Sequence, residues 1–288
     1  MDPDGTNLRR LTENMVGDFF AALSPDRKKI VFDSTRLRLS TEPRNTSDLF
    51  LMETDGTEQT WLTRGSSATW SPDSKNITFH ASASGTGLPT TTDPGAATSD
   101  SDIFVANVDD LLARMAGPQN ITNSPNAIDN DPEWSPDGTK IAFTSHSAAD
   151  PDPRNPSDAE IYVINPDGTG LTRLTFNNYE ERAPSWSPDG SRIVFMASVG
   201  THPGTSGQKF EICAMNADGT NFVQLTDNSV FDGTPTFSPD GQQIVFHRSP
   251  APQQMWMMNA DGTGQMQLTF PPGTNNLANW GLLRVHIH

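Results

Sequence analysis

The sequence predicts an all-β protein, a six-bladed β-propeller built from four-stranded antiparallel blades. Three observations predict it. Five Ser-Pro-Asp turns each follow an apolar residue, and a second apolar run usually ends in an Asp-Gly-Thr type turn. A Leu-Thr or Ile-Thr dipeptide, here called the Leu-Thr close, ends a repeat and occurs six times. Repetition at a nearly fixed period is typical of folds that stack small identical units. The five turns begin at Ser24, Ser71, Ser135, Ser187 and Ser238.

One repeat, residues 183–226, shows the four strands expected in each blade. A short apolar strand ends at Trp186 and enters the turn 187–190, where Pro presets φ, Asp bonds the backbone and Gly accepts a positive φ. The β-branched and aromatic runs 192–196 and 210–215 predict the second and third strands, and a further turn leads to a fourth strand. One such sheet is too small to be stable alone, so copies must stack on it.

The two ends of the chain are expected to share the closing blade. The first close, Leu11-Thr12, precedes every Ser-Pro-Asp turn, so residues 7–12 are interpreted as a fourth strand without its blade. Residues 277–287, with Trp280 in place of a Trp-Ser-Pro turn, would supply its first strand and its second strand. Residues 1–6 match the inside of a repeat, which suggests a piece of a longer protein; in a complete chain the closing blade would be incomplete, with at most three strands. The alternative is an open five-blade array, which exposed sheet edges disfavour.

The composition of the chain argues against two classes of partner, nucleic acids and membranes. The 288 residues carry a net charge of -16, which argues against nucleic acid because such a surface needs clustered Lys and Arg. The same charge disfavours anionic membranes, and no run approaches the roughly 20 apolar residues of a membrane helix. We expect a monomer that forms one propeller domain over residues 1–288. No basic-then-apolar signal sequence is present in this chain.

The repeat resembles the TolB-type propeller repeat. Its unit is W-S-P-D-G, then I-x-F, then D/E-I-Y-V-x-N-x-D-G-T, then L-T, and residues 159–169 match it closely. Relatives of this repeat include periplasmic TolB proteins, propeller domains of prolyl-oligopeptidase-like and tricorn-like proteases, and oligogalacturonate lyases. The resemblance implies the fold and a periplasmic or extracellular location, and it leaves scaffold, protease accessory and lyase open. TolB proteins also carry an N-terminal α/β domain, and nothing here corresponds to it.

Function is expected in the long loops. The turns from first to second and from third to fourth strands are mostly short and uniform, whereas the other connections are mostly long and different in every repeat. Variable loops on a rigid scaffold usually carry binding, although solvated filler is the alternative for these Gly-, Pro-, Ser- and Thr-rich segments. The exception is 109–115, whose apolar spacing predicts one or two helical turns capping a blade edge. The long loops are 37–47, 84–101, 147–158 and 199–209.

Charged residues gather in the fourth-to-first connections, which would open at the mouth of the central channel. Oxygen-rich side chains suit Ca²⁺, so Ca²⁺ is the cofactor this pattern would hold, although no spacing matches an EF-hand loop and a solvated acidic rim is the alternative. The candidates for ligand or partner binding are Asp18, Asp129, Asp131, Glu180, Glu181, Arg182 and Asp232.

A weaker metal set follows the Phe of each second strand. Asp33, His80 and His247 share this register with Thr144 and Met196, and His and Asp side chains bind divalent metals. His80 and His247 would lie nearly opposite each other in a six-blade ring, so solvent-facing histidines are the alternative. The acid before each third strand recurs, which predicts a scaffold role at the strand start for Asp48, Asp102, Glu160 and Glu211.

These patterns predict a non-catalytic binding propeller that recognises a protein or glycan partner through its long-loop face and channel mouth. The alternatives are a metal-dependent polysaccharide lyase or hydrolase acting in the channel, and the propeller domain of a larger protease. No catalytic residue is assigned, because the sequence has no Gly-x-Ser-x-Gly elbow, phosphate loop or dinucleotide fingerprint.

Overall fold

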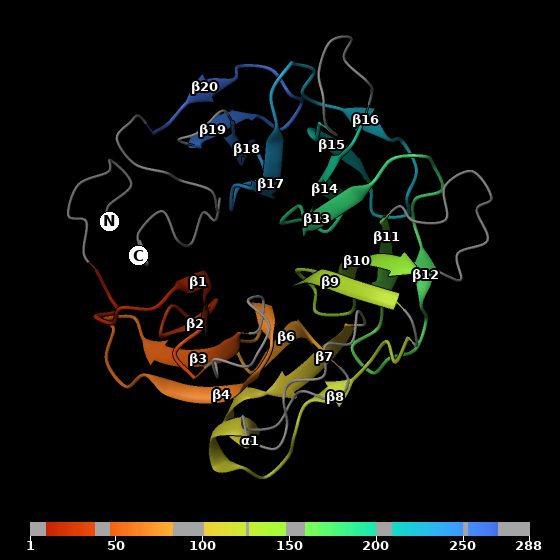
Figure 1. Cartoon of the computed structure of the whole chain (residues 1–288). Helices are drawn as coiled ribbons and strands as arrows, with labels where there is room; N and C mark the ends of the chain where they lie inside the picture. The colour runs from red at the N-terminus through yellow and green to blue at the C-terminus, as the bar shows by residue number, and fades with distance from the viewer. Residues whose placement is uncertain are drawn as a thin grey trace. The chain divides into compact units, whose positions relative to one another are not determined.

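The computed structural model describes residues 10–37, 47–82, 101–124, 127–147, 159–199, 209–249 and 253–269. These residues form five four-stranded sheets, and within each sheet the strands lie side by side in chain order (Figure 1). Neighbouring strands pair antiparallel, as in β14 and β15 (Arg192–Ala197 and Glu211–Asn216).

The strand bounds follow the repeat. The first sheet contains β1 (Asp18–Leu23), β2 (Lys29–Ser34), β3 (Asp48–Glu53) and β4 (Thr60–Arg64). The second contains β5 (Ser66–Trp70), β6 (Asn76–Ala81), β7 (Asp102–Asn107) and β8 (Gln119–Asn120). The third contains β9 (Ala127–Trp134), β10 (Ile141–Ser147), β11 (Glu160–Ile164) and β12 (Thr172–Arg173). The fourth contains β13 (Glu181–Trp186), β14, β15 and β16 (Val223–Gln224). The fifth contains β17 (Asp232–Phe237), β18 (Gln243–Arg248), β19 (Gln254–Asn259) and β20 (Met266–Gln267).

The prediction of six blades is wrong, because the described residues form five four-stranded sheets. Each Ser-Pro-Asp turn joins the first two strands of one sheet, so the number of these turns was the correct count. The sixth blade was inferred from an extra Leu-Thr close at Leu11-Thr12 and from Trp280. Residues 7–9 and 277–287, which were expected to form that closing blade, lie outside the described residues.

The position of Leu11 explains why the Leu11-Thr12 close resembles the end of an additional blade. The carbonyl oxygen of Leu11 lies 2.6 Å from where a Cβ at Gly56 would stand, and Leu174 has the same relation to Gly219 at 2.6 Å. Both glycines have a positive φ, of 88° and 83°, so a side chain there would be strained as well as blocked. Leu11 therefore makes the contact that a preceding sheet makes with the next sheet elsewhere in the chain.

The chain divides into two compact units, residues 1–134 with 165–169 and 281–288, and residues 135–164 with 170–280. In the first unit, β5 packs on β1, β2 and β3, and β9 packs on β5, β6 and β7. In the second unit, β13 packs on β10 and β11, and β17 packs on β13, β14 and β15. The apolar layers between these sheets bury Phe79 in the first unit and Phe195 in the second.

The Ser-Pro-Asp turns form as predicted. In the turn before β14, the Ser187 hydroxyl donates to Asp189 at 2.6 Å and accepts from the Arg192 backbone N–H at 2.9 Å. The Ser187 hydrogen bond, together with those from the Ser191 backbone N–H and hydroxyl, lowers the pKa of Asp189 to about 2. The Ser-to-Asp hydrogen bond recurs in all five turns. The same turn structure therefore joins the first and second strands of every sheet.

The predicted cap at 109–115 is confirmed as a short helix, α1 (Val108–Ala113), between β7 and β8. The residue that caps its C-terminus, Arg114, donates to the carbonyl oxygens of Leu62 at 3.0 Å and Trp61 at 3.2 Å. The guanidinium also lies 4.7 Å from the centre of the Trp61 ring. The insertion thus covers part of β4, the outermost strand of the first sheet, and an uncovered edge strand invites pairing with other chains. No helix in the described ranges is long and apolar enough to cross a membrane.

Candidate functional site

The first strand of every sheet carries one residue in the left-handed region at the same place. These residues have φ between 43° and 55°, a conformation that is uncommon for residues other than glycine. In β1, β5, β13 and β17 a register shift, a β-bulge, occurs there. Bulges re-aim side chains, and strained backbone clusters at functional sites. The residues are Phe20, Ser67, Asp131, Ala183 and Thr234.

The side chains at this bulge differ in every sheet, although the backbone does not. Three residues further on, each strand ends in a large apolar residue, leucine, tryptophan or phenylalanine. Variable side chains on a constant backbone are available for recognition, so these positions are the candidate site. We call the left-handed residue and the residue before it the bulge pair: Phe19–Phe20, Ser66–Ser67, Asn130–Asp131, Arg182–Ala183 and Gly233–Thr234.

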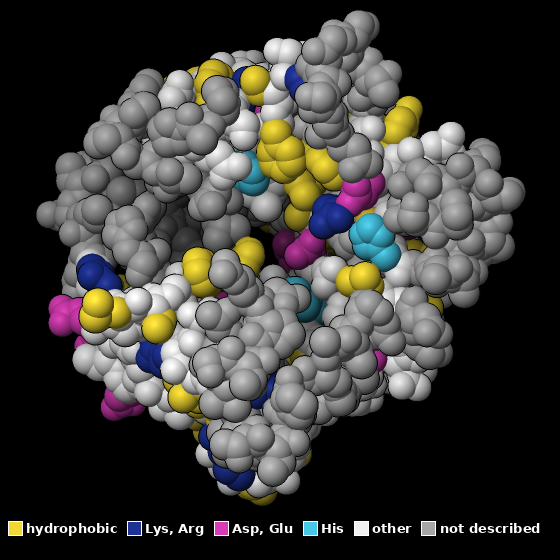
Figure 2. Space-filling view, viewed as in Figure 1, with side chains coloured by type: hydrophobic (Ala, Val, Ile, Leu, Met, Phe, Trp, Pro, Cys, Tyr) yellow, Lys and Arg dark blue, Asp and Glu magenta, His cyan; other side chains and the backbone are white. Residues whose placement is uncertain are grey.

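The first unit contains three bulge pairs, on the successively packed strands β1, β5 and β9. Phe19 and Phe20 are 48% and 43% exposed, and hydrophobic side chains lie at the surface over β1 (Figure 2). Aromatic side chains in partly exposed positions are enriched in protein interfaces.

Asp33 of β2 lies beneath the bulge pair of the next sheet. Its buried carboxylate accepts a short hydrogen bond from the Ser66 hydroxyl and a bond of 3.2 Å from the Ser67 backbone N–H. Burial raises the pKa of Asp33 to about 7, and the hydrogen bonds from the serines oppose this rise. The junction between the first two sheets therefore holds a carboxyl group that changes charge near neutral pH.

The titration of Asp33 is directly testable. We expect the side-chain carboxyl carbon of Asp33 to titrate in a ¹³C NMR experiment with a midpoint near 7, against 3.8 for an ordinary Asp. Ser66→Ala should move the midpoint higher, because it removes the hydroxyl that favours the charged form. A midpoint near 4 in the native protein would contradict the burial of this carboxyl.

His80 of β6 and Asp131 of β9 come together in the first unit. Burial lowers the pKa of His80, and the nearby Asp131 carboxylate opposes that shift. The Nδ1 atom of His80 is buried and has no hydrogen-bond partner. Ser66 is the cross-strand partner of His80. The structure thus brings together one predicted ligand-binding residue and one predicted metal candidate.

The predicted residues at the start of β13 have separate roles. Glu180 and Arg182 form an ion pair, with Arg182 Nε 2.6 Å from Glu180 Oε1. Glu181 is buried, accepts a hydrogen bond of 2.5 Å from Asn177 Nδ2, and has a pKa raised to about 9 by burial and by the facing Glu160 carboxylate. Glu160 is itself paired with a guanidinium at 2.6 Å, that of Arg173.

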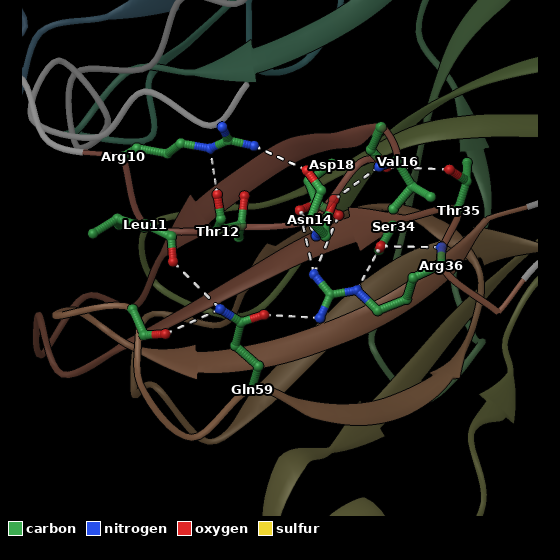
Figure 3. A network of polar contacts seen from close by, with 12 residues as sticks. Arg10, Leu11, Thr12, Asn14, Val16, Asp18, Ser34, Thr35, Arg36 and Gln59 are labelled. Atoms are coloured by element: carbon green, nitrogen blue, oxygen red, sulfur yellow. Dashed lines mark hydrogen bonds and ion pairs between the residues drawn. The ribbon is translucent and has the colours of Figure 1, made fainter.

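Asp18 and Asp232 are buried at the starts of β1 and β17 and are each paired with an arginine. Arg36 lies 3.2 Å from Asp18, within a network that reaches Arg10 and Gln59 (Figure 3). Arg248 lies 2.6 Å from Asp232. An asparagine four residues earlier also donates to each acid at 2.7 Å. These acids anchor the first strand of their sheets.

Asp129 and His247 are also held internally. Asp129 is buried in β9, and its backbone N–H donates to the Ser101 carbonyl at 2.8 Å. His247 Nδ1 lies 2.7 Å from the Thr234 hydroxyl, and its ring stacks on Phe231 with centroids 5.3 Å apart. Burial lowers the pKa of His247 to about 4. In the described ranges, no group of three or more His, Cys, Asp or Glu side chains is placed to hold a metal ion.

The scaffold role of the acid before each third strand is confirmed. Glu211 accepts from the Thr226 hydroxyl of the Leu-Thr close at 2.6 Å, and that hydroxyl accepts from the Ile212 N–H at 2.9 Å. Asp102 accepts from the equivalent Thr122 at 3.2 Å. Asp48 accepts from the Trp61 indole at 2.9 Å. The Leu-Thr close therefore recurs because its hydroxyl ties the fourth strand to the third.

Comparison with known proteins assigns the family. A family model described as the TolB beta propeller domain matches residues 95–284, about two thirds of the chain. The chain belongs to the TolB β-propeller family. An uncharacterized peptidase of Bacillus subtilis is 27% identical over 145 residues, which are 40% of this chain and 21% of the peptidase. The chain thus spans about a fifth of that relative.

Solved structures share the fold of this TolB β-propeller. TolB from Acinetobacter baumannii has a TM-score of 0.63 at 20% identity, covering 89% of this chain and 55% of that one. An oligogalacturonate lyase from Vibrio parahaemolyticus has a TM-score of 0.60 at 14% identity, covering 94% of this chain and 71% of that one. At these identities the likeness concerns the fold alone, and the five sheets are its blades.

In this TolB β-propeller the predicted site residues differ in how deeply they are buried. Asp18, Asp129, Glu181 and Asp232 are buried at strand starts, whereas Asp131 and Arg182 belong to bulge pairs and are only partly buried. Ligand binding by any of them stays a prediction. Phe19 and Phe20 were not named as site residues in the sequence analysis. The signal that could have found them is their spacing: in every repeat the bulge pair lies three and four positions before the apolar residue that ends the first strand.

Proposed function

We propose that this TolB β-propeller is a non-catalytic binding module that recognises a protein or glycan partner through its bulge pairs and the adjoining long loops. The observation that supports it is the repeated bulge, which keeps one strained backbone and changes its side chains in each blade. Most of the long loops, 84–100 and 148–158 among them, lie outside the described residues. The bulge pairs therefore supply the testable part of the surface.

The bulge pairs of each unit have side chains suited to recognition. Those of the first unit include two partly exposed phenylalanines and the Asp131 carboxylate, and those of the second unit include the Arg182 guanidinium. Aromatic residues and Arg are enriched in protein interfaces, and aromatic faces also stack on sugars. The family likeness supports a periplasmic or extracellular location and a protein partner, both of which belong to this proposal.

The test is selection of ligands with matched variants. The native protein should enrich binders from a random peptide display library or an oligosaccharide panel. A bulge variant carrying Phe19→Ser, Phe20→Asn, Asp131→Asn and Arg182→Gln should bind the same ligands at least about tenfold more weakly. The exposed control Asp109→Asn on α1 should keep them. Thermal melting of each variant checks folding, and equal binding by the bulge variant would refute the proposal.

Metal analysis of the purified protein distinguishes a metal-dependent enzyme from a non-catalytic binding module. A transition metal held in a one-to-one ratio and lost on His80→Ala or His247→Ala would favour a metal-dependent lyase or hydrolase. Calcium bound at equal ratio would support the predicted Ca²⁺ without deciding for catalysis, because Ca²⁺ commonly stabilises loops and binding surfaces.

A further inference from the structure

A surface cavity of about 300 Å³ lies between the α1 insertion and β4 in the first unit. Its lining includes Trp61 and Leu62 of β4, Leu111 of α1, and the residues that follow α1 up to Pro118. Because β4 and β1 are opposite edges of the first sheet, the cavity is separate from the bulge pairs. A ligand held here would be recognised independently of them.

Most of the residues that line the cavity are apolar. Leu62 and Leu111 are buried, and the Trp61 ring is partly buried. Met115 is 78% exposed, and its unbranched thioether side chain can adapt to the shape of a ligand. Ligand sites typically combine such an apolar lining with a few polar groups that fix the orientation of the ligand. The cavity therefore suits the apolar part of a small molecule.

The Arg114 guanidinium places a positive charge at this cavity. Its backbone N–H caps α1 by donating to the Asp110 and Leu111 carbonyl oxygens. Its side chain is held by the hydrogen bonds to the Leu62 and Trp61 carbonyl oxygens and by the Trp61 ring. Figure 2 shows basic and hydrophobic side chains at the surface over α1. A side chain that is already ordered loses less conformational freedom when a ligand binds.

No carboxylate compensates the charge of Arg114 within the ranges that the structure describes. Both of its side-chain hydrogen bonds go to neutral carbonyl oxygens. Arg36 of the same unit is instead paired with the buried Asp18. A guanidinium has five N–H groups, so Arg114 keeps donors for an anion.

We propose that this cavity binds a small organic carboxylate, whose apolar body contacts Trp61, Leu111 and Met115 and whose carboxylate accepts hydrogen bonds from Arg114. Guanidinium and carboxylate match in geometry and form charge-assisted hydrogen bonds. A volume of about 300 Å³ equals that of about ten water molecules. The cavity therefore fits an acid of about ten non-hydrogen atoms, such as an arylalkanoic acid.

The test compares three compounds on the native protein: 3-phenylpropionate, the neutral 3-phenylpropionamide, and acetate. Binding is followed through the NMR signals of the Met115 methyl group and the Trp61 indole N–H. We expect 3-phenylpropionate to shift both signals saturably. The amide and acetate should bind at least about tenfold more weakly, because the amide lacks the charge and acetate lacks the apolar body. This comparison does not depend on the folding of any variant.

Matched variants test the role of Arg114. Arg114→Gln should weaken the binding of 3-phenylpropionate about tenfold. Arg27→Gln removes the same charge from an exposed position of the same unit and should leave binding unchanged. An equal loss in the two variants would overturn the inference, as would equal binding of the acid and the amide, or a Met115 signal that does not move. Acetate that binds as tightly as 3-phenylpropionate would overturn it as well, because it would show an adventitious ion only.

Discussion

Replacing Glu181 with Gln should raise the free energy of unfolding at pH 8, and the gain should shrink as the pH falls toward 5. Burial and the facing Glu160 raise the pKa of Glu181 from 4.5 to about 9. Between these pH values the unfolded chain has released a proton that the folded chain still holds. The free energy of unfolding therefore falls with rising pH, by up to about 1.4 kcal/mol per unit.

Gln is the informative substitute because it resembles the protonated acid. Its amide oxygen can accept from Asn177, as the carboxyl does now, and its amide nitrogen can donate toward Glu160 without titrating. Denaturant unfolding between pH 5 and pH 9 should show a steeper decline for the native protein than for Glu181→Gln. Parallel curves would contradict a neutral, buried Glu181.

The matched control is Asp232→Asn, which should destabilise the protein throughout this range. Asp232 occupies the equivalent place in the next blade but lies opposite Arg248, whereas Glu181 lies opposite Ala197. Removing the carboxylate leaves a mostly buried guanidinium without its partner, at a cost of about 3 kcal/mol. Removing the acid at the same strand position should therefore stabilise one blade and destabilise the next, because the cross-strand neighbour is Ala197 in one and Arg248 in the other.

The local structure of each blade was predictable because its signals are short-range. The Ser-Pro-Asp turn depends on a hydroxyl and a carboxylate two residues apart, as in Ser187 and Asp189, and the strands follow from β-branched and aromatic runs. The blade number was not predictable from the Leu-Thr closes. Leu11 packs on Gly56 as a neighbouring blade would, and sequence alone does not show whether the other strands of that blade accompany it.

The site was only partly predictable because burial depends on cross-strand partners. Glu181 and Arg182 are adjacent in sequence, yet one is buried at the strand start and the other belongs to the bulge pair. A bulge changes the alternation of sides by one residue, and its left-handed residue is Ala183, a type that does not signal a positive φ. Charge composition pointed to the fourth-to-first connections, but it did not show which of their side chains reach solvent.

Trp186→Ala should lower the free energy of unfolding by about 3–5 kcal/mol. The indole is 8% exposed and lies in the apolar layer between the third and fourth sheets, with Ile161 and Val163 of β11 and Phe195 of β14. Truncation removes this buried surface and opens a cavity where two sheets meet. Denaturant unfolding at fixed pH measures the loss.

Two further substitutions show whether the loss comes from this layer. Trp186→Phe should cost less, about 1–2 kcal/mol, because most of the ring volume remains and Phe237 fills the equivalent place in β17. Leu171→Ala, at a side chain 52% exposed, should stay within about 0.5 kcal/mol. If Trp186→Ala cost no more than Leu171→Ala, the indole would not fill the space between the sheets, and the bulge residues located by counting back from it would have to be reassigned.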